Sequence, residues 1–108
     1  MSNGQPPGDP AALPPAPWFV YLIECDDDSI YTGIAVDVAA RYAAHLAGKG
    51  ARYTRMHAPV RLLASAEHAD RSSALKAEYQ IKQLTAAEKR SYAAELSAET
   101  IGPPDKKP

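Results

Sequence analysis

Residues 18–25 (WFVYLIEC) constrain the fold of this chain more than any other segment, because they are apolar at nearly every position. Their aromatic and β-branched side chains favour a strand, and only Glu24 interrupts the apolar run. A strand that is apolar on both faces has to be covered on both faces. We therefore expect residues 18–25 to form the central strand of a sheet.

A second strand is predicted after a short acidic turn. The turn DDDS is followed by residues 30–34 (IYTGI), which resume a β pattern and predict an antiparallel hairpin. In such a hairpin the paired residue numbers add up to about 52–54, so Tyr21 and Tyr31 should lie at similar levels, with the register deciding whether they share a face. Gly33 indicates a bulge or a close backbone approach.

The remaining elements are predicted from helix caps and apolar segments. Asp37 should cap a helix that Gly48 ends, a basic loop through Gly50 and Thr54 should follow, and the TAAE sequence at residues 85–88 forms a capping box. The predicted ranges are a helix over 38–47, a third strand over 60–67, a helix over 73–84 capped by Asp70 or Ser72, and a last helix through about 98. The order β-β-α-β-α-α predicts an α+β fold, with a small three-stranded antiparallel or mixed sheet flanked by helices.

The chain is predicted to begin with a disordered, proline-rich tail and to end with a flexible one. Residues 1–17 contain six prolines, and Leu13 is their only large apolar side chain beyond Met1, so they cannot bury enough surface to offset their ordering entropy. Residues 102–108 (GPPDKKP) have the same character. One domain over residues 18–101 remains.

Cysteine and hydropathy patterns exclude several classes. Cys25 is the only cysteine, which excludes an intrachain disulfide and a cysteine-based zinc site. No apolar run approaches the ~20 residues of a membrane span, and the N-terminal residues lack the pattern of a signal peptide. The cytoplasm is the expected location.

The net charge of −1 conceals an uneven distribution. Residues 38–66 contain no acidic side chain but hold five cationic ones, Arg41, Lys49, Arg52, Arg55 and Arg61. Clustered basic charge is typical of a polyanion site even in a nearly neutral protein. A solvated basic loop explains the charge distribution equally well.

Four polar side chains in the first half of the domain could converge. Tyr21 and Tyr31 lie on the paired strands, while Arg41 and His45 are four residues apart on the following helix and so share a face. Arginine suits a phosphate because its planar guanidinium donates two hydrogen bonds and keeps its charge. Taken singly, each of these residues also has an ordinary structural role.

Glu78 is the most informative carboxylate, because its helical neighbours Ala74, Leu75 and Ile81 are apolar. It should therefore lie on, or at the edge of, the helix face that packs against the sheet, where a carboxylate is costly unless a cation or strong donors meet it. One interpretation is a salt bridge to Lys82. The other is a ligand for Mg²⁺, bound by one carboxylate together with substrate phosphate and water.

These residues together resemble the GIY-YIG nucleases, most closely their short, stand-alone members. The first motif reads Phe19-Val20-Tyr21, which keeps the tyrosine but not the glycine, and the second reads Tyr31-Thr32-Gly33. The segments GKGARYT (48–54) and EYQIKQLT (78–85) resemble the short subfamily, and the resemblance covers about residues 18–90. The family's helix arginine and histidine match Arg41 and His45, and its metal-binding glutamate matches Glu78.

The resemblance implies an endonuclease that hydrolyses phosphodiester bonds with one Mg²⁺ or Mn²⁺ per site. Tyr31 would help to activate the attacking water, Tyr21 would orient that water, and Arg41 would stabilise charge on the phosphate. His45 could hydrogen-bond a tyrosine or relay a proton, Gly33 would support the turn of the backbone, and Glu78 would hold the metal as a Lewis acid. Further candidates for contacts with nucleic acid are Lys49, Arg52, Tyr53 and Arg55.

The expected substrate is branched, nicked or single-stranded DNA in repair or genome maintenance, with RNA left open, because so small a domain has little surface for reading a sequence. Many family members carry an asparagine after the metal-binding glutamate, whereas Asn3 is the only asparagine here. This difference favours an alternative, a nucleic-acid-binding module with little or no catalysis. A third hypothesis is a protein-interaction domain whose proline-rich tail binds a partner.

Overall fold

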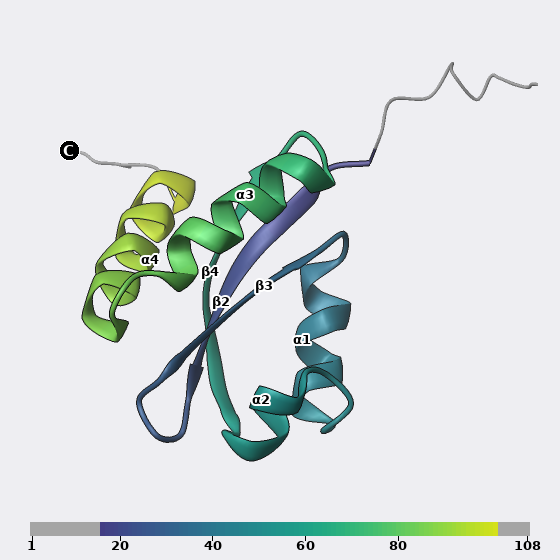
Figure 1. The fold of residues 1–108 in the computed structure, drawn as a ribbon, viewed down its shortest axis with the longest axis vertical. Helices are drawn as coiled ribbons and strands as arrows, with labels where there is room; N and C mark the ends of the chain where they lie inside the picture. The colour runs from purple at the N-terminus through teal and green to yellow at the C-terminus, as the bar shows by residue number, and fades with distance from the viewer. Residues whose placement is uncertain (1–15, 102–108) are drawn as a thin grey trace, which may run out of the picture.

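The computed structural model describes residues 16–101 (Figure 1). Its elements are β2 (Trp18–Cys25), β3 (Ile30–Ala35), α1 (Val38–Leu46), α2 (Arg52–Met56), β4 (Pro59–His68), α3 (Arg71–Lys82) and α4 (Ala86–Ile101). Residues 1–15 and 102–108 lie outside the described residues, so the two tails and the domain boundaries stay predictions. No helix in the described part of the chain is long and apolar enough to cross a membrane.

The sheet is antiparallel throughout, with the order β3-β2-β4, so the predicted central position of β2 is confirmed. Tyr21 pairs with Gly33 and Ile23 pairs with Tyr31. The paired residue numbers add up to 54 in this register, which is the upper end of the predicted range. Tyr31 is two positions from the residue opposite Tyr21, and because side chains alternate along a strand, the two tyrosines share one face.

Alternation along β2 divides the core into two layers. Val20 and Leu22 pack against residues of α3 such as Ala74 and Ile81, whereas Tyr21 and Ile23 belong to a second cluster on the opposite face. Two residues of α1, Val38 and Tyr42, pack against this second cluster. Figure 1 accordingly shows α1 and α2 on one side of the strands and α3 and α4 on the other. The apolar character of β2 on both faces is explained by this double covering.

Side-chain caps begin three of the helices, as predicted. The carboxylate of Asp37 accepts a hydrogen bond from the Ala40 amide at 3.0 Å. The carboxylate of Asp70, rather than Ser72, caps α3 by accepting from the Ser73 amide at 2.8 Å, and this bond lowers the pKa of Asp70. Thr85 and Glu88 exchange both bonds of the capping box, at 2.8 and 3.1 Å.

The prediction of a plain basic loop between α1 and β4 was wrong in one part. A five-residue helix, α2, lies within it. Its N-cap residue, Ala51, makes no side-chain hydrogen bond to the helix. The sequence therefore lacks the serine, threonine, aspartate or asparagine that usually indicates a helix N-terminus. So short a helix is unstable alone and depends on tertiary contacts, here those of the buried residue Thr54.

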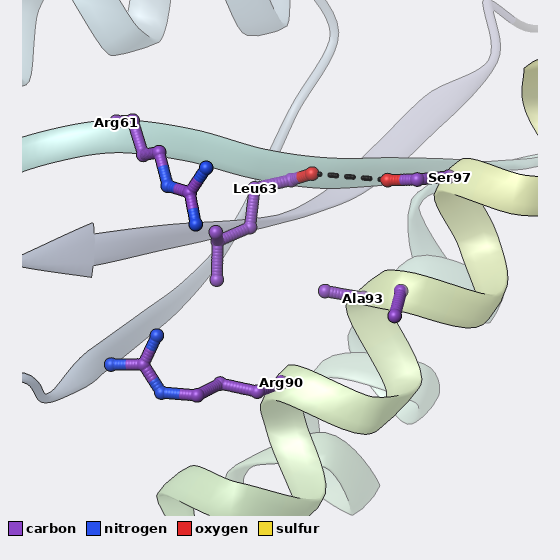
Figure 2. Close-up of a pocket in the computed structure, with 6 residues that line it drawn as sticks. Arg61, Leu63, Arg90, Ala93 and Ser97 are labelled. Carbon is purple, nitrogen blue, oxygen red and sulfur yellow. Dashed lines mark hydrogen bonds between the residues drawn. The ribbon is translucent and has the colours of Figure 1, made fainter.

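Glu24, the only charged residue of β2, joins the sheet to α4. Its two carboxylate oxygens accept from Arg61 and Arg90, each at 2.7 Å, and Arg90 also donates to the Asp28 carbonyl at 2.8 Å. The two arginines line a pocket of about 300 Å³ between β4 and α4 (Figure 2). Further along this contact, the Ser97 hydroxyl donates to the Leu63 carbonyl at 3.3 Å.

The substitution Glu24→Gln should lower the free energy of unfolding at pH 7. Hydrogen bonds from Arg90 and then Arg61 lower the pKa of Glu24 in the folded protein below its ordinary value of 4.5. Such a group contributes stability above its unfolded pKa and loses it as the pH falls through the folded pKa. Urea unfolding of both proteins should therefore show a gap at pH 7 that shrinks below pH 4.5. A gap that does not change with pH would contradict this.

Candidate active site

Tyr21 of β2 and Tyr31 of β3 lie close together over Gly33 of β3. Their ring centroids are 6.3 Å apart, and the Tyr21 side chain is fully buried. A Cβ atom at Gly33 would lie 2.5 Å from the Tyr21 hydroxyl oxygen and 3.1 Å from Cε2 of Tyr31. Only glycine leaves room for the Tyr21 phenol here, so the predicted close backbone approach is confirmed.

His45 lies beside both tyrosines and is itself buried. Its ring centroid is 5.8 Å from that of Tyr21 and 5.2 Å from that of Tyr31. The Nε2 atom of His45 is 2.8 Å from the Tyr21 hydroxyl, and the Nδ1 atom is 2.6 Å from the hydroxyl of Thr54. The Thr54 hydroxyl in turn donates to the Ala51 carbonyl at 3.0 Å. A continuous hydrogen-bonded chain thus leads from Tyr21 to the start of α2.

The electrostatics of this cluster keep both of its buried rings neutral at pH 7. Burial, followed by the charge of Tyr31, raises the pKa of Tyr21 to about 12, although Arg41 lowers it through a hydrogen bond and its charge. Burial, followed by the charge of Arg41, lowers the pKa of His45 below 6.5. Tyr21 is therefore a protonated phenol and His45 a neutral imidazole.

Arg41 and Glu78 approach this cluster from different layers of the fold. Arg41 is exposed on α1, and both Arg41 and Glu78 act electrostatically on Tyr21, with opposite signs. On α3, Ala74 and Ile81 are buried while Leu75 is 36% exposed, so Glu78 lies at the edge of the packed face, as predicted. Its side chain is 17% exposed and its Oε2 atom is 3.4 Å from Lys82 Nζ, so the alternative of a rim salt bridge is also realised.

The two layers meet at the free edge of β3. A cavity of about 360 Å³ lies there, lined by Tyr31 and Tyr53 from one layer and by Lys82 and Lys89 from the other. The Lys89 ammonium donates to the Ile30 carbonyl at 3.1 Å, and burial, followed by the charge of Lys82, lowers its pKa. The sequence pattern does not place either lysine at this edge, because helix periodicity does not show which strand edge a helix will reach.

The predicted nucleic-acid contacts lie around α2. Tyr53 is 38% exposed and stacks between Tyr31, at 5.8 Å, and His57, at 4.2 Å between centroids. Lys49, Arg52 and Arg55 are exposed, and within residues 16–101 no salt bridge engages them. Their contact with nucleic acid stays a prediction.

The donor set at the site suits a hard divalent cation only if the substrate completes it. No cluster of three or more His, Cys, Asp or Glu side chains that could hold a metal ion occurs in the described part of the chain. Glu78 alone would supply the protein carboxylate, and Mg²⁺ commonly accepts one or two carboxylates with phosphate and water as the other ligands. Glu78 therefore fits such an ion.

Comparison with known proteins decides the family. A family model described as GIY-YIG catalytic domain matches residues 17–92. The chain belongs to the GIY-YIG family. The UPF0213 protein H16_B0156 of Cupriavidus necator is 53% identical over 81 residues, which are 75% of this chain and 88% of that protein. The UPF0213 protein YhbQ of Escherichia coli K12 is 49% identical over 79 residues, 73% of this chain and 79% of that protein.

A solved structure is also similar to this GIY-YIG chain. It is the solution NMR structure of the UPF0213 protein BH0048 from Bacillus halodurans, which is 38% identical in sequence. The match covers 72% of this chain and 83% of that chain, with a TM-score of 0.46. The family match confirms the resemblance drawn from the motifs and assigns a nuclease fold to the chain.

The GIY-YIG motif departs from its name at Phe19, which takes the position of the first glycine. Phe19 pairs regularly with Ala35 in the β2–β3 ladder. Within residues 16–101, Asp28 is the only non-glycine residue with a positive φ, so the backbone at Phe19 does not need glycine. The departure therefore imposes no backbone strain at this position.

Proposed function

We propose that this protein is a divalent-metal-dependent endonuclease that hydrolyses phosphodiester bonds in DNA. The observation that supports this most is the close grouping of three rings, those of Tyr21, Tyr31 and His45, with centroids 5.2 to 6.3 Å apart. Arg41 lies beside them, and Glu78 influences the same phenol from α3. Hydroxyls to handle a water, a guanidinium for phosphate and a carboxylate for a cation are the groups that such a hydrolysis requires.

Each residue has a distinct role in the proposed reaction. Tyr31 helps to activate the attacking water and takes its proton only when Tyr31 itself is a phenolate, while Tyr21 accepts a hydrogen bond from the same water and orients it. Tyr21 suits the second role because its pKa is about 12 and its hydroxyl is hydrogen-bonded to His45. Arg41 stabilises the charge that develops on the phosphate. Glu78, with water and the substrate phosphate, would hold one Mg²⁺ or Mn²⁺, which when bound supplies Lewis-acid stabilisation.

The proposed substrates are branched, nicked or single-stranded DNA, in repair or genome maintenance, with RNA open as a second substrate. Lys49, Arg52 and Arg55 are exposed beside the site, and the cavity at the β3 edge carries Lys82 and Lys89. Such contacts address phosphates rather than bases, so affinity should fall steeply with salt. The cytoplasmic location stays a prediction.

The substitution Tyr31→Phe should reduce DNA cleavage at least about a hundredfold, since general-base assistance contributes on the order of 10²–10⁴ in rate. Cleavage is measured on nicked, branched, single-stranded and duplex oligonucleotides with Mg²⁺, with Mn²⁺ and with EDTA. Tyr79→Phe is the matched control because Tyr79 is 69% exposed. Wild-type protein that cuts no substrate with either ion would contradict the proposed function, and an active Tyr31→Phe protein would contradict the role of Tyr31.

A binding module with little catalysis is the second candidate. The observation that favours it is the Lys82 ammonium 3.4 Å from Glu78, which competes with a cation for that carboxylate. This function predicts DNA binding in EDTA that is lost in Arg52→Ala and Arg55→Ala proteins and is unchanged in Tyr31→Phe. Binding without cleavage in every metal condition would select it.

A further inference from the structure

The segment between α1 and α2 encloses the buried ring of His45. After α1, the chain turns at Gly48, which has a φ of 77°, and the Lys49 amide donates to the Ala44 carbonyl at 2.8 Å. This turn brings Gly50 against the imidazole of His45. A Cβ atom at Gly50 would collide with Nδ1 of the ring and would lie only 2.7 Å from its Cε1 atom. Four residues later, Thr54 is 2% exposed and meets Nδ1 of the same ring.

The direction of each hydrogen bond in this chain follows from its last member. The Ala51 carbonyl can only accept, so Thr54 must donate its single hydroxyl proton to it across 3.0 Å. The Thr54 oxygen therefore accepts from His45, which places the imidazole proton on Nδ1. The Nε2 atom of a neutral imidazole is then an acceptor, and Tyr21 donates its hydroxyl proton to Nε2 across 2.8 Å.

The opposite tautomer leaves a contact without a proton. If His45 carried its proton on Nε2, Thr54 would have to donate to Nδ1, and its 3.0 Å contact with the Ala51 carbonyl would join two acceptors. Burial, followed by the charge of Arg41, lowers the pKa of His45 and so favours a neutral ring, which cannot donate from both nitrogens. Only the tautomer protonated at Nδ1 therefore gives each of the three contacts, Tyr21–His45, His45–Thr54 and Thr54–Ala51, one proton.

We infer that Thr54 is a positioning residue, which holds His45 in the tautomer protonated at Nδ1 so that its Nε2 accepts the hydroxyl proton of Tyr21. Gly50 leaves the space in which the ring adopts this orientation. With its proton directed at His45, the Tyr21 oxygen can still accept a hydrogen bond from the attacking water beside the one that it accepts from Arg41. The catalytic consequence rests on the proposed function, but the tautomer itself does not.

Thr32 provides a matched contrast within the same sheet. It is as buried as Thr54, at 2% exposure, but its hydroxyl oxygen has no hydrogen-bond partner among the described residues. Burial of a threonine therefore does not by itself imply a role for the hydroxyl. Replacement of either residue by valine removes the hydroxyl at nearly constant shape, and only Thr54→Val should affect His45.

The test is the ¹⁵N spectrum of the imidazole rings in the full-length protein at pH 8, where His45 is neutral. The chain has three histidines, so His57→Gln and His68→Gln proteins assign the His45 signals. Protonated Nδ1 and unprotonated Nε2 are expected in wild type, Thr54→Ser and Thr32→Val, with the proton shifted towards Nε2 in Thr54→Val. A wild-type spectrum with protonated Nε2 would overturn the inference, even if Thr54→Val fails to fold.

Kinetics separate positioning from binding. Thr54→Val should lower kcat about tenfold to a hundredfold, by analogy with the loss when the hydrogen-bond partner that orients a metal-binding histidine is removed. KM should not change, since the hydroxyl is buried, and Thr54→Ser should restore most of kcat. Equal losses in the valine and serine proteins would overturn the positioning role. If wild type cleaves nothing, the proposed function fails, and the spectrum still decides whether Thr54 sets the tautomer.

Discussion

Glu78→Gln should abolish metal-dependent cleavage of DNA while leaving the protein folded. The carboxylate is the proposed protein ligand of the cation, and the loss of such an electrostatic contribution costs on the order of 10²–10³ in rate. The fold should tolerate the change, because the partner of Glu78 is Lys82 at 3.4 Å, with a side chain that is 50% exposed. Helix pairs of this spacing contribute only about 0.3–0.5 kcal/mol. Cleavage and thermal unfolding are measured together.

Two further variants complete the Glu78 experiment. Glu95→Gln removes the same charge from an exposed position on α4 and should cleave like wild type. Lys82→Ala removes the competing ammonium, so it should bind Mn²⁺ at least as tightly as wild type in a calorimetric titration, whereas Glu78→Gln should bind it weakly. Full activity in Glu78→Gln would show that this glutamate only stabilises the helix.

Arg41→Ala should lower kcat by about 10²–10³, the loss found when one preorganised donor to developing charge is removed. Arg41→Lys should recover part of it, since lysine keeps the charge but not the planar pair of donors. Arg71→Ala is the matched control, because Arg71 lies 5.5 Å from the Trp18 ring, where α3 begins. Comparable losses in both arginine variants would indicate a general effect of charge on binding.

An independent measurement accompanies the Arg41 prediction. The charge of Arg41 contributes to the lowered pKa of His45, after burial. Its removal should therefore raise the pKa of His45 towards 6.5, which an NMR titration measures without any substrate. An unchanged His45 titration would show that Arg41 does not point towards the Tyr21–His45 pair.

Several features could be predicted because each depends on local sequence. The β2–β3 hairpin follows from an apolar segment, an acidic turn and a second β segment, and its register agrees with the predicted range. Asp37, Asp70 and the Thr85–Glu88 pair begin helices through hydrogen bonds that span three residues. Such contacts form between neighbours in the chain, so sequence spacing is sufficient to propose them.

Helix α2 and the two lysines of the β3 edge could not be predicted for the opposite reason. A five-residue helix without a side-chain cap has no periodic pattern of its own, and it forms where Thr54 is held by His45. Lys89 reaches the carbonyl of Ile30, 59 residues earlier in the chain. Contacts of this kind depend on how two layers pack, which no local pattern expresses.

By itself, the sequence determined the central strand, the hairpin, the capped helices, the family and the residue types of the site. The tertiary structure alone decided how these residues act together. It placed Gly33 under the Tyr21 phenol, brought Lys82 and Lys89 to the free edge of β3, and closed the α1–α2 segment over His45. The physical reason is that local hydrogen bonds and side-chain alternation act over a few residues. By contrast, proton positions and pKa values depend on burial and on partners that only packing brings together.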